Sequence, residues 1–304
     1  MSSLRQKIAL GEFVITVELE PPKGVNMDKL LLSAWQLEQK VDAINITDSP
    51  MANMRMSPIS VAHILQREVG LDAIFHLTCR DRNLIGLQSE LLGAAALGVQ
   101  NILVLTGDDP KRGDHPTARG IFEVDSVGLV HIANTLNQGY DQSGNPLNQA
   151  PEFYIGVAAN PCAADLEHEV EKVLAKIAAG AHFIQTQPVY ELESLQRFVE
   201  RLAQPHIPII AGILPLKSYR MARHIAENIP GIHIPLQLLR AMESGGRATG
   251  MRVAQQLLAD LPACAQGAHI MPVGDAGIVT ELLAVASAPI PVSNRARLRA
   301  PIAF

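Results

Sequence analysis

Short β-rich apolar runs alternate along this chain with longer segments in which apolar residues recur every three or four positions. Short runs of this kind are typical of buried strands, and the longer periodic segments are typical of amphipathic helices. The runs predict strands at 13–19, 42–47, 72–78, 101–106, 152–158, 182–187, 207–213 and 268–273. The periodic segments predict helices at 28–39, 58–68, 84–97, 125–136, 165–179, 192–202, 217–227 and 246–259. Asp165, directly before LEHEVEKVLAKIAAG, is an example of a helix-start signal.

The alternation of strands and helices predicts the fold class. Helices of this length between strands favour parallel βαβ units, and eight repetitions favour a closed barrel over an open sheet. We therefore expect an α/β protein, a (β/α)8 TIM barrel, as a single domain over residues 1–304. The polar stretch 137–151 contains turn formers and no hydrophobic period, so it should be an exposed loop at the end of the barrel away from the site. It could also be a linker, but two half-barrels would have open sheet edges, which argues against two independent domains.

Composition narrows the class of protein. The chain is 48% hydrophobic and 18% charged, which indicates a globular protein with a large buried core. A net charge of −5 offers no cationic field for nucleic acid or an anionic membrane. Three cysteines without a CxxC pair, and histidines without HxH or HExxH spacing, predict neither a disulfide framework nor a metal site. With no signal-peptide core and no run near the roughly 20 apolar residues of a membrane span, we expect a cytoplasmic protein.

Three polar side chains stand where predicted strands end. They are Glu18 in FVITVELEPP, Asp108 in NILVLTGDDP and Gln187 in HFIQTQPVY. Because the carboxyl ends of barrel strands converge on one face, these residues are candidates for a single site. Alternation along the first strand places Glu20 on the same face as Glu18, so either glutamate is a candidate acid by this criterion.

Nucleotide-binding signatures are missing from the sequence. No GxGxxG follows the first predicted strand, and no GxxxxGK[ST] occurs, so a nucleotide cofactor would have to be bound by loops at the barrel mouth. Gly107 in the TGDDP turn allows either close backbone approach to a ligand or a tight turn, and its spacing does not separate the two.

Seven ordered segments resemble the methylenetetrahydrofolate reductases, a family of flavin-dependent (β/α)8 barrels. The segments are VELEPPKG, NITDSP, FHLTCRDRN, ILVLTGDDP, FYIGVAANP, AGAHFIQTQPVY and IIAGILPLKSY. Their forms are most similar to the reductase portion of chains in which it is fused to homocysteine methyltransferase. No methyltransferase segment occurs in these 304 residues.

The resemblance implies a redox reaction in one-carbon metabolism that supplies methionine biosynthesis. In it 5,10-methylenetetrahydrofolate is reduced to 5-methyltetrahydrofolate by hydride transfer through FAD, which NADH or NADPH reduces. Opening the folate's five-membered ring requires a proton at N10 while a cationic N5 iminium develops. The resemblance implies that Glu18, rather than Glu20, supplies the proton through a water and that Asp108 stabilises the cation. We expect enclosure beside flavin and apolar side chains to raise the pKa of Glu18.

The resemblance also implies contacts to both ligands. For the substrate, Gln187 would bind the pterin's amide-like edge, and its alternative role is a structural hydrogen bond. Tyr219 would stack on the nicotinamide or folate ring, and its alternative role is packing at the start of a helix. The implied FAD contacts are Thr47 and His76 near the isoalloxazine, Lys176 near the adenylate or phosphates, and Thr106 and Asn160 in the same cleft. As alternatives, His76 could be a core histidine and Lys176 a surface lysine.

Two departures from the family's flavoprotein branch concern the flavin. Thr106 replaces the arginine of the familiar LRGD, and the loop after the fifth strand is shorter. Losing a guanidinium removes charge-assisted contacts, so FAD could be bound more weakly, replaced by FMN, or absent. Two other functions therefore stay open: folate-dependent methyl transfer or demethylation, and a noncatalytic folate-binding subunit of a redox complex. A ferredoxin-like electron donor and a homo-oligomer are equally open.

Overall fold

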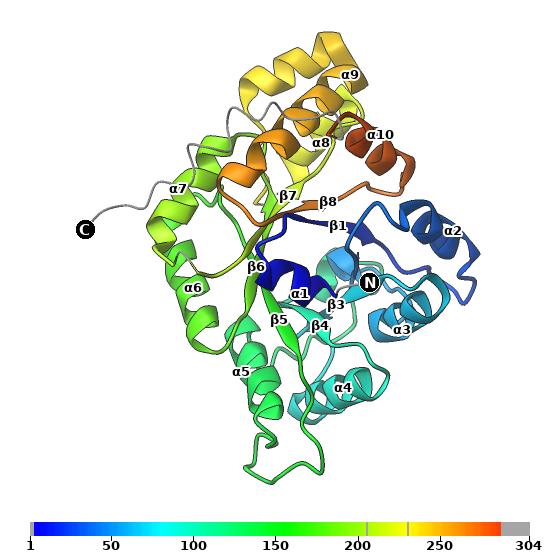
Figure 1. The fold of residues 1–304 in the computed structure, drawn as a ribbon, viewed down its shortest axis with the longest axis vertical. Coiled ribbons are helices and arrows are strands. Elements are labelled where there is room, and N and C mark those ends of the chain that lie inside the picture. The colour runs from blue at the N-terminus through cyan, green and yellow to red at the C-terminus, as the bar shows by residue number, and fades with distance from the viewer. Residues whose placement is uncertain (1–2, 205, 230, 287–304) are drawn as a thin grey trace.

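The computed structural model describes residues 3–286 except 205 and 230, and its strands close into one parallel barrel (Figure 1). The strands are β1 (Val14–Leu19), β2 (Ala43–Ile46), β3 (Asp72–Thr78), β4 (Asn101–Leu105), β5 (Tyr154–Ala159), β6 (Phe183–Pro188), β7 (Ile209–Ile213) and β8 (Gly267–Ile270). Each pairs with the next in sequence order, and β8 pairs with β1. The predicted (β/α)8 TIM barrel is confirmed. The ends of the expected domain, residues 1–2 and 287–304, lie outside the described residues.

Helices surround the barrel and follow the predicted order. They are α2 (Asp28–Leu37), α3 (Pro58–Val69), α4 (Leu84–Ala96), α5 (Ser126–Asn137), α6 (Leu166–Ala178), α7 (Leu192–Leu202), α8 (Tyr219–Asn228) and α9 (Leu236–Asp260). The expected start of α6 is confirmed, because the Asp165 side chain accepts a hydrogen bond from the His168 amide.

Three helical segments were not predicted. The short α1 (Leu4–Ala9) precedes β1, and α10 (Gly277–Ala286) follows β8. The last predicted helix, 246–259, in fact begins at Leu236. Its sequence contains adjacent glycines that suggest a boundary, but the structure continues through Gly246 with a kink at φ 47° and ψ −137°.

Side chains inside the barrel divide into two layers. At the amino-terminal end of the strands, α1 lies over the middle of the barrel (Figure 1), where Leu4 and Ile8 join an apolar cluster with Ile74, Phe183 and Ile210. At the carboxyl-terminal end, most of the inward side chains are polar. This second layer contains Thr16, Asn45, His76, Gln185 and His269, which are all buried. The apolar layer therefore forms a floor beneath a polar interior.

The predicted loop at 137–151 projects from the barrel between α5 and β5 (Figure 1). Asn137 closes its two ends, because its side-chain amide donates to the carbonyl of Phe153 at 2.9 Å and its oxygen accepts from the Phe153 amide at 2.8 Å. The loop follows a helix and precedes a strand, so it lies at the amino-terminal end of the barrel, as expected.

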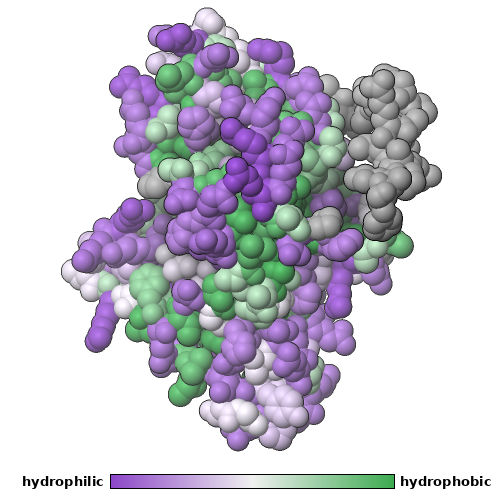
Figure 2. All heavy atoms as spheres, turned by 90° about the vertical axis from the view of Figure 1, so that its left-hand side faces the viewer, coloured by the Kyte–Doolittle hydropathy of each residue, from purple (hydrophilic) through white to green (hydrophobic). Residues whose placement is uncertain are grey.

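One face of the outer surface is mainly polar (Figure 2). Figure 2 shows hydrophilic side chains over most of one face, with apolar side chains visible between them. Among the described residues, no helix combines the length and apolar character needed to cross a membrane.

Candidate active site at the barrel mouth

The carboxyl-terminal ends of the strands surround a cavity of about 340 Å³. Glu18 from β1, Asp108 from the loop after β4 and Gln187 from β6 all line it. Their convergence follows from barrel topology, since parallel strands end on one face. The structure thus brings the three strand-end residues together, while their individual roles stay predictions.

A second cavity of about 170 Å³ adjoins the first and shares Leu105, Thr106, Ala158 and Gln187 with it. The five expected cofactor residues are distributed over this pair. Thr47 and His76 line the first cavity, Thr106 lines both, and Asn160 and Lys176 line the second. Because they share these lining residues, the two cavities lie side by side at the mouth of the barrel.

Lys176 is a buried residue of α6. Its side chain is 9% exposed, and its ammonium donates to the carbonyl of Ala158 at 2.8 Å. Burial lowers its pKa, partly offset by the charge of Glu169. The alternative of a solvated surface lysine is therefore wrong, because the side chain lies along the end of β5 beside the second cavity.

Tyr219 lies outside the residues that line either cavity. It starts α8 and packs against an apolar cluster that includes Tyr190 and Leu216. This placement matches the packing alternative and does not bring its ring to the site. Its expected stacking role stays a prediction.

Glu18 faces a histidine from the last strand. Its Oε2 lies 3.8 Å from Nε2 of His269, which is fully buried, while the Glu18 side chain is 32% exposed. Burial favours the neutral acid, but interaction with His269 outweighs it and lowers the pKa of Glu18. The pKa is lowered here because β8 places a histidine beside the carboxylate, and the rise expected with a flavin beside Glu18 stays a prediction.

A buried hydrogen-bond chain supports this histidine. Asn45 connects the two histidines, since its Nδ2 lies 3.2 Å from Nδ1 of His269 and its Oδ1 lies 3.0 Å from Nε2 of His76. Thr16 Oγ1 lies 2.9 Å from the same Nδ1 of His269. If Asn45 donates to that nitrogen, the network assigns the proton of a neutral His269 to Nε2, which faces Glu18.

His76 is a neutral member of this chain. Burial lowers its pKa to about 4, against the smaller opposing effect of the Glu18 charge. At neutral pH it therefore offers hydrogen bonds and no positive charge.

Glu20 is separated from the cavity. It follows the last residue of β1, and its Oε1 forms an ion pair with Arg55 at 2.7 Å. Its side chain is 48% exposed, and it is not among the residues that line the cavity. Strand alternation left Glu18 and Glu20 as equal candidates, and the structure places only Glu18 at the site.

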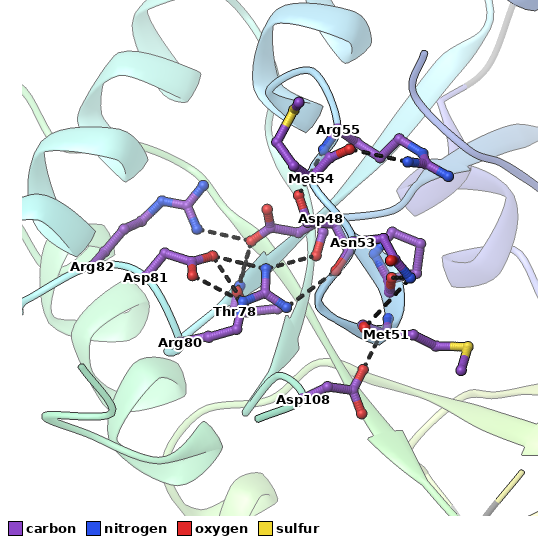
Figure 3. Close-up of polar contacts among 12 residues, drawn as sticks. Asp48, Met51, Asn53, Met54, Arg55, Thr78, Arg80, Asp81, Arg82 and Asp108 are labelled. Carbon is purple, nitrogen blue, oxygen red and sulfur yellow. Dashed lines mark hydrogen bonds and ion pairs between the residues drawn. The ribbon is translucent and has the colours of Figure 1, made fainter. Parts of the chain in front are cut away.

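Asp108 is oriented by a strained loop. Its Oδ2 accepts a hydrogen bond from the amide of Met51 at 3.1 Å (Figure 3). Ser49, Met51 and Ala52 all have positive φ angles, of 47°, 53° and 57°, which are unfavourable for residues with a Cβ. Strain of this kind persists only where surrounding contacts hold the backbone, and it often accompanies function.

Buried charges hold that loop. Asp48 Oδ2 accepts hydrogen bonds from the backbone and hydroxyl of Thr78, each at 2.9 Å, and from Arg82 at 2.8 Å (Figure 3). Arg80 donates to the carbonyl of Ser49 at 3.1 Å. These contacts connect β2 and β3 to the loop whose amide positions Asp108.

Gly107 forms the tight turn that was one of its two expected purposes, and close approach to a ligand stays a prediction. Its φ of 93° belongs to the left-handed region that favours glycine. A Cβ on this residue would also lie 2.9 Å from the Cβ of Thr78. The turn before Asp108 therefore needs glycine for its conformation and for its close approach to β3.

The family model for methylenetetrahydrofolate reductase matches residues 3–287. This chain belongs to the methylenetetrahydrofolate reductase family. It is 26% identical to the Salmonella typhimurium 5,10-methylenetetrahydrofolate reductase over 77% of this chain and 75% of that protein. It is also 26% identical to methylenetetrahydrofolate reductase 2 of Schizosaccharomyces pombe over 79% of this chain, but it spans only 38% of that longer protein.

A solved structure from Clostridium thermocellum has the same fold. It superposes with a TM-score of 0.67 at 17% identity, covering 94% of this chain and 98% of that one. The protein is described as binding two copies of 5-methyl-5,6,7,8-tetrahydrofolic acid.

Some residues of this reductase-family site were not found from the sequence. Asn45, Gln185 and His269 are buried polar residues within strands that otherwise look apolar. The signal available was alternation: Gln185 lies two positions before Gln187 and so shares its face of the strand. That signal identifies an inward-facing side chain, but it does not reveal which other strand's side chain it meets.

Proposed function

We propose that this chain reduces 5,10-methylenetetrahydrofolate to 5-methyltetrahydrofolate, with a flavin as hydride carrier and NADH or NADPH as electron donor. The observation that carries the proposal is the convergence of Glu18, Asp108 and Gln187 on one cavity in a barrel of this family. The names of the bacterial relatives, and the methyltetrahydrofolate described for the Clostridium thermocellum protein, support it. The cytoplasmic setting expected from the sequence stays part of the proposal.

Glu18 is the proposed source of the N10 proton, delivered through a water. Its lowered pKa means that it is ionised at neutral pH before a ligand binds. Its side chain is 32% exposed, so a ligand that covers it removes water and strengthens the effect of burial, which raises the pKa. Ligand binding thereby favours protonation of Glu18 at the time when the folate ring needs a proton.

Asp108 is the proposed stabiliser of the iminium cation at N5. The Met51 amide holds one of its carboxylate oxygens, so the group is oriented before the substrate arrives. A negative charge held in place needs little reorganisation as the positive charge develops, and that is the main source of electrostatic catalysis.

Gln187 is the proposed ligand of the pterin edge. Its side chain lies at the end of β6, lines both cavities and is exposed. An amide offers both a donor and an acceptor, which matches the mixed donor and acceptor edge of a pterin.

The residues expected to hold a flavin fit such a group. Thr47 Oγ1 is buried in the first cavity without a hydrogen-bond partner, as expected for a site that a polar ligand completes. Thr106, Asn160 and Lys176 continue the lining into the second cavity, where the rest of an elongated cofactor would lie. A bound flavin would supply the hydride for the folate. Because Thr106 lacks the charge of an arginine, we expect binding weaker than in the flavoprotein branch and keep FMN, or no flavin, as alternatives.

The test is an absorbance experiment on the purified full chain under anaerobic conditions. The protein, loaded with FAD and reduced by NADH or NADPH, should regain the oxidised flavin spectrum when methylenetetrahydrofolate is added. Formation of 5-methyltetrahydrofolate should match the amount of flavin reoxidised. A reduced flavin that is stable in the presence of methylenetetrahydrofolate would contradict the proposal and favour a noncatalytic folate-binding function.

A further inference from the structure

The bottom of the first cavity contains a glutamine whose amide oxygen has no hydrogen-bond partner. Gln185 on β6 is 5% exposed and lines the cavity, and its Oε1 is buried without a hydrogen-bond partner among the described residues. Across the described chain, four buried side-chain polar atoms lack hydrogen-bond partners, and three of them belong to this cavity: Thr47 Oγ1, Gln185 Oε1 and His269 Nε2. Of these three, His269 Nε2 still faces the Glu18 carboxylate at 3.8 Å, so Thr47 and Gln185 are the two that have no polar group opposite them. The concentration of unpaired atoms at one place indicates a ligand and not a packing defect.

Folding alone does not explain a glutamine at this position. A buried polar atom without a partner lowers stability, whereas an apolar side chain of similar size would fill the space without that cost. The residues paired with Gln185 on the neighbouring strands are Ala158 and Ile210, both apolar. A polar side chain between them is expected where binding, rather than packing, determines the residue.

The local form of β6 points this amide inward. The pairing of β6 with β7 is irregular between Gln185 and Pro188, and the Gly212 amide donates to Thr186 Oγ1 at 2.9 Å. A Cβ on Gly212 would lie 2.6 Å from the carbonyl oxygen of Thr186, so this close pairing depends on glycine. Gln185 and Gln187 both line the cavity, at positions about 7 Å apart along the strand, because side chains two residues apart share a face.

We propose that Gln185 is a specificity-determining residue that binds the pyrimidine edge of the pterin ring. It would do so from the bottom of the cavity, below Gln187. A half-turn of a terminal amide exchanges its oxygen and nitrogen, so the group can accept from a ring N–H or donate to the ring carbonyl. The inference rests on the proposed function, because it takes a folate as the ligand.

The test replaces the amide and keeps the shape of the side chain. Gln185→Met retains an unbranched chain of similar length without hydrogen-bonding groups. Isothermal titration calorimetry of the full chain with 5-methyltetrahydrofolate should show an affinity at least about ten-fold weaker than that of wild type. The melting temperature should stay equal or rise, because an unpaired buried oxygen has been removed. A structural glutamine would instead lower the melting temperature on replacement.

Gln142 provides a matched control. Its Nε2 is also buried and unpaired, but it lies in the 137–151 loop at the other end of the barrel. Gln142→Met makes the same chemical change, and its affinity for 5-methyltetrahydrofolate should equal that of wild type. Titrations with FAD and with NADH form two further arms, in which Gln185→Met should bind like wild type.

Each contrary result has a distinct meaning. Wild-type folate affinity in Gln185→Met overturns the inference and leaves the proposed function standing. A loss confined to FAD or NADH, or a lowered melting temperature with unchanged affinity, overturns it as well. If the wild-type protein itself binds no 5-methyltetrahydrofolate, the proposed function and the inference fail together.

Discussion

The two ends of the barrel interior are built on opposite principles. At the floor, Phe183, Ile74 and Ile210 pack with α1 into a closed apolar cluster. At the mouth, most inward side chains are polar, Thr47 Oγ1 and Gln185 Oε1 are buried without hydrogen-bond partners, and the loop beside Asp108 is strained. Apolar packing stabilises the fold at one end. At the other end, polar atoms without partners and a strained backbone lower stability, as is typical of a site for a ligand or a reaction.

The strongest change that we predict is loss of the folate half-reaction at the mouth of the barrel. Glu18→Gln removes the proposed proton donor, so the folate half-reaction should slow by about 10²- to 10⁴-fold. Reduction of the bound flavin by the nicotinamide nucleotide should be retained. Stopped-flow absorbance separates the two steps. Glu20→Gln is the matched control and should react like wild type, because Glu20 pairs with Arg55 away from the cavity. Full folate turnover in Glu18→Gln would show that the acid is another group.

A change at the floor should act on stability. Phe183 is fully buried, so Phe183→Ala should lower the free energy of unfolding by about 3–5 kcal/mol, measured by urea denaturation. Met271→Ala truncates a partly exposed side chain at the mouth and should have a clearly smaller effect. Equal losses in the two variants would contradict the division of the interior into a stabilising floor and a functional mouth.

The electrostatic role of Asp108 should appear in one half-reaction only. Asp108→Asn keeps the shape and removes the charge, so folate reduction should fall by about 10²-fold while flavin reduction changes little. Rapid-mixing kinetics of both half-reactions provide the measurement. A larger loss in flavin reduction than in folate reduction would place Asp108 with the cofactor and not with the iminium.

The smallest effect concerns the pH dependence of stability. His76 has a pKa of about 4 in the folded protein, below its ordinary value of 6.5, so the unfolded chain binds its proton more readily. Stability from this group should therefore fall as the pH decreases from about 6.5 to about 4, by up to about 3 kcal/mol. Urea denaturation at both ends of that range should show a smaller decrease for His76→Gln. Equal decreases in the two proteins would mean that His76 does not titrate as described.

Much of the fold could be predicted from local pattern. Alternating apolar runs and periodic segments identify the strands and most helices, because burial on a sheet or on one helix face leaves a repeat in the sequence. Two of the helical segments that were missed have weak signals. α1 has only six residues, and the adjacent glycines Gly245 and Gly246 suggest a boundary where α9 continues with a kink.

Local periodicity, together with the rule that parallel strands end on one face, was enough to predict the strands, their order and the strand-end positions of Glu18, Asp108 and Gln187. The direction of the Glu18 pKa shift depends instead on contacts that form only when the barrel closes. Barrel closure brings β8 to β1, so His269 meets Thr16, 253 residues away, and faces Glu18. Proton affinity depends on neighbours in space, and a local pattern contains no information about which strands close the barrel at that point.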